Sequence, residues 1–137
     1  MEASSGNNTN KTMTKQEIYD KVCKHLAKQK TRATVLGSCA YRTDDGKKCA
    51  VGCLIPYHVW RKEVGANNTG VGLDALCEES PWAKKNFGRN LNLLTELQNA
   101  HDSDLSDAQG LRENLRDIAK CYRIKPGAEQ AIKVWNP

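Results

Sequence analysis

The chain has 137 residues, close to the size of one domain, and 39% of them are hydrophobic, enough for a core without disulfide staples. Its longest apolar run, residues 50–56, is far shorter than the roughly 20 residues that cross a bilayer, which argues against a membrane protein. The net charge of +5 is uneven, because residues 11–48 hold ten Lys and Arg against four Asp and Glu, whereas residues 49–137 hold eleven of each.

The first residues of the chain are polar throughout. Residues 1–12 lack the apolar segment of a secretory signal, so we expect a disordered leader followed by a single domain over 13–137. A protein kept in a reducing compartment usually has free thiols. We therefore favour reduced cysteines over a disulfide framework for the six cysteines of the chain.

The first predicted element is a helix over about 15–29. Thr14 and Glu17 have the spacing of a capping box, in which each side chain binds the backbone amide of the other residue. One apolar stripe follows at intervals of four residues: Ile18, Val22 and Leu26. The solvent-exposed face carries two pairs of oppositely charged residues, also four residues apart: Glu17 with Lys21, and Asp20 with Lys24. The excess of lysines in this region can attract an anionic partner, although a solvated helix face is the simpler interpretation.

The next segment, residues 39–53, predicts a β-hairpin. Asp44-Asp45-Gly46 is typical of a three-residue turn with Gly46 in the left-handed conformation. Alternation from that turn predicts one buried face: Cys39, Tyr41, Cys49, Val51 and Cys53. The other face is small near its base and cationic near its tip: Ala40, Arg42, Lys48, Ala50 and Gly52. We expect a ligand to approach this second face, with Arg42, Lys47 and Lys48 as its cationic contacts.

Short helices are predicted for the rest of the chain. They begin after Pro56, near Val71, at Ser80-Pro81, at Asn90 and at Ser106, where Ser106-Asp107-Ala108-Gln109 reads as a second capping box. A last short helix would place Ile132 and Trp135 against the core. A helix, a hairpin and several short helices make a single-domain α+β fold.

Several cysteines and a histidine lie close enough in the sequence to be considered as metal ligands. Cys49, Cys53 and His58 could ligate zinc with Cys39, but four residues of extended strand would hold Cys49 and Cys53 about 13 Å apart. We therefore expect thiols that pack as small hydrophobic groups, with no metal and no cofactor.

His101 and Asp102 form an adjacent polar pair that we take as a second candidate binding site beside a cleft, although neighbouring residues on a helix point apart. No catalytic residue is predicted. A small hydrolase that uses a cysteine or His101 stays an alternative.

Three segments together resemble a family of small proteins encoded by tailed phages and prophages: CAYRTDDGKKCAVGCLIP (39–56), LQNAHDS (97–103) and LRDIAKCYRI (115–124). The resemblance runs from about residue 14 to residue 124, and DGKKCAVGCLIP is its specific part. Tyr57 stands where we expect an acidic residue after the proline. The resemblance implies a location in the host cytoplasm and an accessory role, and it implies no catalytic residues.

The leading interpretation is a non-enzymatic, phage-type accessory protein that acts by binding. We favour counter-defence as its setting, either by blocking a host protein or by sequestering an anionic nucleotide signal. The alternative is a DNA- or RNA-binding module that uses the basic first third, although the hairpin tip lacks exposed aromatic side chains for stacking. No membrane partner is expected, and assembly into a homo-oligomer is left open.

Overall fold

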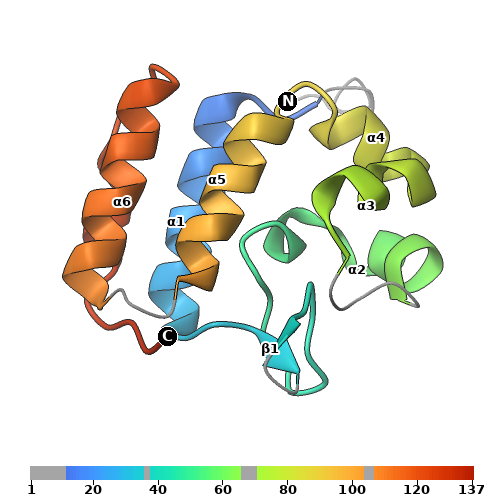
Figure 1. The fold of residues 1–137 in the computed structure, drawn as a ribbon, viewed down its shortest axis with the longest axis horizontal. Helices are drawn as coiled ribbons and strands as arrows, with labels where there is room; N and C mark the ends of the chain where they lie inside the picture. The colour runs from blue at the N-terminus through green and yellow to red at the C-terminus, as the bar shows by residue number, and fades with distance from the viewer. Residues whose placement is uncertain (1–11, 36–37, 66–70, 104–106) are drawn as a thin grey trace, which may run out of the picture.

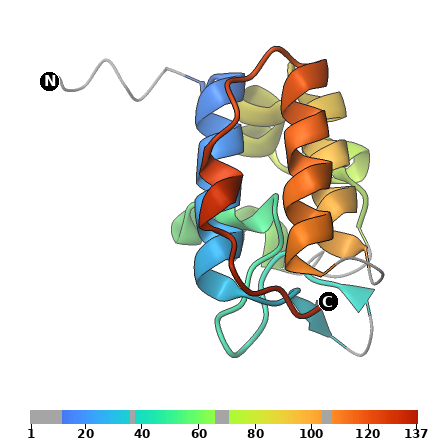
Figure 2. The same cartoon turned by 90° about the vertical axis from the view of Figure 1, so that its left-hand side faces the viewer.

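The computed structural model describes residues 12–35, 38–65, 71–103 and 107–137, with the backbone alone described at residues 35, 38 and 39. Three helices stand side by side on one half of the molecule (Figures 1 and 2): α1 (Lys15–Gln29), α5 (Leu91–Asp102) and α6 (Ala108–Cys121). Shorter helices make the other half: α2 (Tyr57–Val59), its π-helical continuation η3 (Trp60–Val64), α3 (Leu73–Glu79) and α4 (Pro81–Phe87). Apart from Thr12, the predicted leader over 1–12 lies outside the described residues and stays a prediction.

Helix α1 forms as the sequence predicts. The Thr14 hydroxyl accepts from the Glu17 amide at 3.1 Å, and the Thr14 amide donates to the Glu17 carboxylate at 2.9 Å, which completes the capping box. The apolar stripe is buried, together with two polar-tipped neighbours: Ile18, Tyr19, Val22, Cys23 and Leu26. The prediction of a helix over 15–29 is therefore confirmed, including its start and its buried side.

The C-terminal segment lies as a strap along α1 (Figure 2). It contains the short helix η5 (Ala128–Ala131), and Ile132 and Trp135 follow that helix with their side chains buried. The strap is fixed at its end, because the Asn136 amide donates to the Lys30 carbonyl at 2.8 Å. Ile132 and Trp135 thus reach the core as expected, but they lie beyond the last helix and not within it.

The predicted α+β fold is wrong, because the hairpin over 39–53 is not formed and the protein is mostly helical. Only the turn survives: Gly46 has φ 91°, the Thr43 amide donates to the Lys47 carbonyl at 2.8 Å, and Arg42 and Lys48 make one isolated antiparallel bridge. Beyond the bridge the two sides separate, and Cys39 pairs with Thr34 in a two-residue ladder between β1 (Thr34–Val35) and β2 (Ser38–Cys39).

The second side of the expected hairpin turns into a helical turn. The Cys53 amide donates to the Cys49 carbonyl at 3.0 Å, and η2 (Gly52–Leu54) follows. A Cβ on Gly52 would lie 2.0 Å from the Tyr41 carbonyl oxygen, so the chain folds back over its own backbone at this glycine. Ala40 and Ala50, expected on an open face, are fully buried. Residues of both predicted faces are therefore buried. The alternating pattern of the sequence predicted one buried and one exposed face, and the structure has no exposed face there.

The remaining helix starts agree closely with the sequence. The Ser80 hydroxyl accepts from the Ala83 amide at 3.1 Å, and Pro81 opens α4. Helix α6 is capped by Asp107, which accepts from the Gly110 amide at 2.8 Å, so the predicted cap at Ser106 is wrong by one residue. In the part of the chain that the structure describes, no helix is long and apolar enough to span a bilayer.

Candidate anion-binding site

Four lysines from two parts of the chain surround one shallow surface hollow of about 280 Å³. Three of them lie on α1 at spacings of three and four residues, which places them on one helix face. The fourth comes from the turn that follows Gly46. We call these residues the lysine cluster: Lys21, Lys24, Lys28 and Lys48. His25 and Cys53 line the same hollow.

The carboxylates expected to pair with these lysines are used elsewhere. The Glu17 carboxylate accepts from the Thr14 amide, and the Asp20 carboxylate accepts from the Gln16 side-chain amide at 2.9 Å. Among the described residues, no ion pair involves any member of the lysine cluster. The predicted pairs Glu17–Lys21 and Asp20–Lys24 are therefore not formed, and the helix face keeps its positive charge.

The backbone of Lys48 is anchored on α1. Its amide donates to the Gln29 side-chain oxygen at 2.7 Å, and its carbonyl accepts from the Gln29 side-chain nitrogen at 2.8 Å. The same carbonyl accepts from His25 Nε2 at 2.9 Å. These three bonds fix the turn against the helix, so that Lys48 joins three lysines that lie at least 20 positions earlier in the chain.

The two uncharged groups of the hollow are held in their neutral forms. Burial lowers the pKa of His25 and outweighs its hydrogen bond to the Lys48 carbonyl, and the charges of Lys48 and Lys28 lower it further. Burial raises the pKa of the Cys53 thiol to about 12 although nearby lysines oppose the rise, and the thiol donates to the Ala50 carbonyl at 3.1 Å. A protonated thiol is a poor nucleophile, so the hollow offers cations for binding and no activated cysteine.

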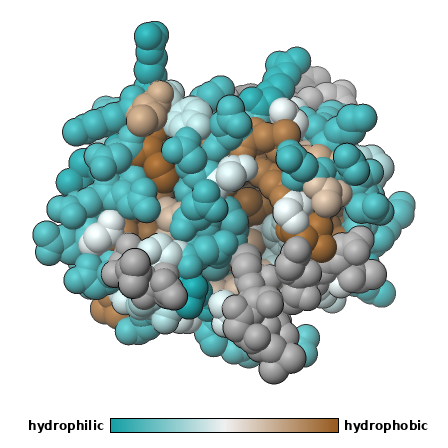
Figure 3. Space-filling view, in the orientation of Figure 1, coloured by the Kyte–Doolittle hydropathy of each residue, from teal (hydrophilic) through white to brown (hydrophobic). Residues whose placement is uncertain are grey.

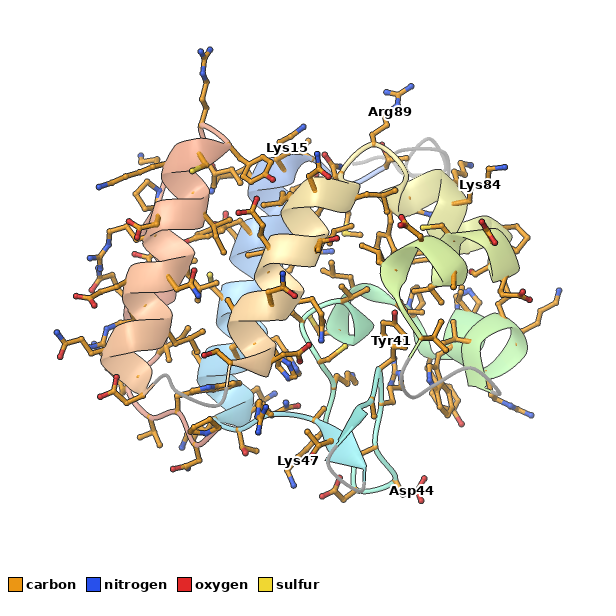
Figure 4. The ribbon with its side chains drawn as sticks, viewed as in Figure 1. Lys15, Tyr41, Asp44, Lys47, Lys84 and Arg89 are labelled. Atoms are coloured by element: carbon orange, nitrogen blue, oxygen red, sulfur yellow. The ribbon has the colours of Figure 1, made fainter. Side chains whose placement is uncertain are left out.

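The three cations predicted at the hairpin tip have three different surroundings. Lys48 belongs to the lysine cluster, whereas Lys47 pairs with Asp45 at 2.7 Å on the exposed turn. Arg42 donates to the Ile55 carbonyl at 2.8 Å, and its guanidinium lies 5.6 Å from the centre of the Tyr57 ring. Figure 4 shows Lys47 on the loop at one end of the molecule and Lys15 at the other, so the cations of the basic first third are spread along the molecule.

His101 is a core residue. It is fully buried at the end of α5; its Nε2 accepts from the Ala33 amide at 3.2 Å, and its Nδ1 donates to the Asp102 carboxylate at 2.7 Å. The ring also meets Trp135 edge-on, with 5.9 Å between ring centres. Both ring nitrogens are therefore occupied by structural hydrogen bonds. The expectation that His101 and Asp102 point apart is wrong, because Asp102 is the last residue of its helix and its carboxylate reaches back to the ring.

Asp102, unlike His101, does line a cleft. This second cavity, of about 280 Å³, lies between α5 and residues 71–73, and its lining includes Tyr41, Val51, Gln98 and Asp102. Hydrophilic side chains cover most of the same side of the molecule, and apolar surface shows through in the recess between α5 and the short helices (Figure 3). Asp102 therefore lines a different hollow from the lysine cluster, and His101 lines neither.

The predicted separation of Cys49 and Cys53, which argued against a shared zinc ion, is wrong. Cys49 and Cys53 lie one helical turn apart and not about 13 Å apart in a strand. Each sulfur nevertheless has a backbone partner: the Gly52 amide donates to Cys49 Sγ at 3.2 Å, and Cys53 donates to Ala50. Among the residues that the structure describes, no three His, Cys, Asp or Glu side chains could hold a metal ion together.

Two features were missed by sequence reasoning. The α1 lysines were not predicted to form a site, although their spacing of three and four residues places them on one helix face. Tyr57 departs from the phage-type pattern and carries no predicted role, and the structure shows it to be 59% exposed. No protein-family model, curated protein or solved structure matches the chain. The resemblance to phage-encoded proteins therefore stays an expectation carried by its three segments.

Proposed function

We propose that this protein is a non-enzymatic accessory protein that binds a phosphate-bearing anion through the lysine cluster. The observation that carries the proposal is the convergence of four lysines, without carboxylate partners among the described residues, around one hollow. Lysine ammonium groups bind phosphate oxygens as point charges, and several of them together raise the local concentration of an anion.

The chemistry of the hollow favours an anion over a protein surface as the bound group. Central contacts between proteins are usually aromatic or apolar and depleted in lysine, whereas this hollow is rimmed by lysines. Phosphates of a nucleotide signal and of a nucleic acid share the same binding chemistry. The phage-type segments support counter-defence in a host cytoplasm as the setting, by sequestration of an anionic ligand.

The test is a binding titration with two probes and two double variants. A cyclic dinucleotide and a fluorescent 12-nucleotide oligothymidylate are titrated against the full chain at several salt concentrations. Lys24→Ala/Lys28→Ala removes two members of the lysine cluster, whereas Lys84→Ala/Lys85→Ala removes the same charge from exposed positions of α4. We expect the first variant to weaken binding at least tenfold and the second to change it less than about twofold.

The salt dependence distinguishes the two sources of phosphate. For a single strand, loss of two lysine contacts should flatten the slope of log affinity against log salt by about 1.4. Equal losses in the two double variants would contradict the proposal, because they would show an effect of net charge alone. Absence of binding to both probes at 50 mM salt would also overturn it.

A further inference from the structure

Tyr57 is an exposed aromatic residue that lies against two other side chains. Its ring stacks on Trp60, with 6.0 Å between ring centres and 26° between ring planes. The Arg42 guanidinium lies 5.6 Å from the centre of the Tyr57 ring and 5.8 Å from that of Trp60. Trp60 is half-buried, whereas 59% of Tyr57 remains open to solvent. The phenol is thus supported by two neighbours and still presents a large surface.

The helix that carries Tyr57 is cationic on its outer side. His58, Arg61 and Lys62 line a shallow hollow of about 360 Å³ beside it. The one acidic residue of the segment, Glu63, is turned away, because its carboxylate accepts from the Ser80 hydroxyl at 2.6 Å and from the Trp82 amide at 3.2 Å. The segment from Trp60 to Val64 is π-helical, a rare geometry that is frequent at functional sites.

The turn after Gly46 joins this surface to the lysine cluster. Arg42 and Lys48 face each other in an antiparallel bridge, and side chains of directly opposed residues project to the same side. Lys48 belongs to the lysine cluster, whereas Arg42 lies against Tyr57. Figure 1 shows the segment from residue 40 to residue 55 between α1 and α2. Positive charge therefore continues from α1 across the turn to an exposed aromatic ring.

We infer that Tyr57 is a base-stacking position for single-stranded nucleic acid, whose phosphates continue onto the lysine cluster. This inference rests on the proposed function, since it requires the lysine cluster to bind phosphate. Single-strand binding proteins combine a basic path for the backbone with aromatic side chains on which bases stack. Bases in a duplex already stack on one another, so an exposed ring beside lysines is matched to an unpaired strand. Arg42 acts as a positioning residue, because it lies against the ring and donates to the protein backbone.

The test separates stacking from phosphate binding by using two probes of equal charge. The first is the fluorescent 12-nucleotide oligothymidylate, and the second is a 12-unit abasic strand with the same phosphates and no bases. Tyr57→Ala should weaken binding of oligothymidylate by about 5- to 150-fold and leave binding of the abasic strand within about twofold. Tyr57→Phe, which keeps the ring, should bind both probes as the wild type does.

The lysine variant supplies the contrast. Lys24→Ala/Lys28→Ala should weaken binding of both probes, because both carry phosphates. If this variant weakens binding but Tyr57→Ala has no effect on oligothymidylate, the stacking inference is wrong and the proposed function stands. If the wild type binds neither strand, the stacking inference is wrong, and the proposed function is then decided by the cyclic dinucleotide, whose failure to bind as well would overturn it. Circular dichroism of Tyr57→Ala shows whether the fold is kept; if it is not, wild-type preference for oligothymidylate over the abasic strand decides the inference, and equal affinity overturns it.

Discussion

The buried contact between α1 and the C-terminal strap allows a quantitative prediction. The Tyr19 hydroxyl donates to the Glu129 carboxylate at 2.6 Å, and both side chains are at most 1% exposed. Tyr19→Phe removes this donor, while the Gly127 amide still donates to the same carboxylate oxygen at 2.8 Å. A buried hydrogen bond to a charged group contributes about 1.5–3 kcal/mol, so we expect a loss of about 2 kcal/mol in the free energy of unfolding at pH 7.

Urea unfolding followed by circular dichroism measures this loss. With a slope of about 2 kcal/mol per molar urea, the midpoint should fall by about 1 M. Tyr122→Phe is the matched control, because the Tyr122 hydroxyl also bonds a carboxylate, that of Glu96, but at the surface. Its effect should stay within about 0.5 kcal/mol. Equal losses in the two variants would refute the reasoning that burial gives the Tyr19 contact its strength.

The same pair predicts a pH dependence. Burial alone would raise the pKa of Glu129, but the hydrogen bonds from Tyr19 and the Gly127 amide outweigh it and lower the pKa below the usual 4.5. A lowered pKa in the folded state means stability that is fully present above pH 4.5 and is lost as the pH falls through the folded pKa. The stability difference between the wild type and Tyr19→Phe should therefore narrow below pH 4.5. A difference that stays constant down to acid unfolding would show that the carboxylate charge has no part in the contact.

Two further predictions concern the segment that carries Lys48. Gly52→Ala should lower the free energy of unfolding in urea by about 1–3 kcal/mol, because its Cβ would lie 2.0 Å from the Tyr41 carbonyl oxygen. The control Gly72→Ala places its Cβ near no atom within 4 Å and should be nearly neutral. Equal effects of the two substitutions would contradict the close approach at Gly52. Cys53, with its pKa raised by burial to about 12, should react with iodoacetamide at pH 8 at least a hundredfold more slowly than the exposed Cys121, and mass spectrometry of the labelled peptides would reveal comparable rates if the thiol were activated.

Helix positions could be predicted from the sequence because their determinants are local. Capping residues such as Thr14 and Ser80 act within one turn, and apolar spacing of three or four residues selects one face. The hairpin prediction was wrong because only its turn has local determinants, whereas the pairing of its two strands depends on tertiary contacts. The turn at Gly46 closes as the sequence indicates, and then Gly52 approaches the Tyr41 backbone and directs the chain into helix η2. The alternation of apolar and polar residues in the sequence cannot predict such a tertiary contact.

The candidate site was predictable only in part for a related reason. The sequence indicates how many lysines lie in the first third, but not which carboxylates remain to neutralise them. His101 and Asp102 were predicted as a polar pair that binds a ligand, and the structure instead uses both ring nitrogens of His101 to hold Ala33 and Asp102. Arg42 looked like a ligand contact, and it supports an aromatic ring instead. The identity of each hydrogen-bond partner depends on tertiary structure.

The positive surface of this protein follows from how its fold uses acidic side chains. Glu17 caps α1, Asp45 pairs with Lys47 in the turn, and Glu63 binds Ser80 and the backbone at the start of α4. Each of these carboxylates stabilises a local structure, and two of them, Glu17 and Glu63, belong to the helical segments that present the lysine cluster and the Tyr57 surface. Because these acids serve local structures, the four lysines of the lysine cluster have no carboxylate partner in the part of the chain that the structure describes. The positive charge of this surface is therefore larger than the net charge of the chain suggests. A substitution such as Glu63→Gln would weaken the hydrogen bonds at the start of α4 more than it would change the charge of that surface.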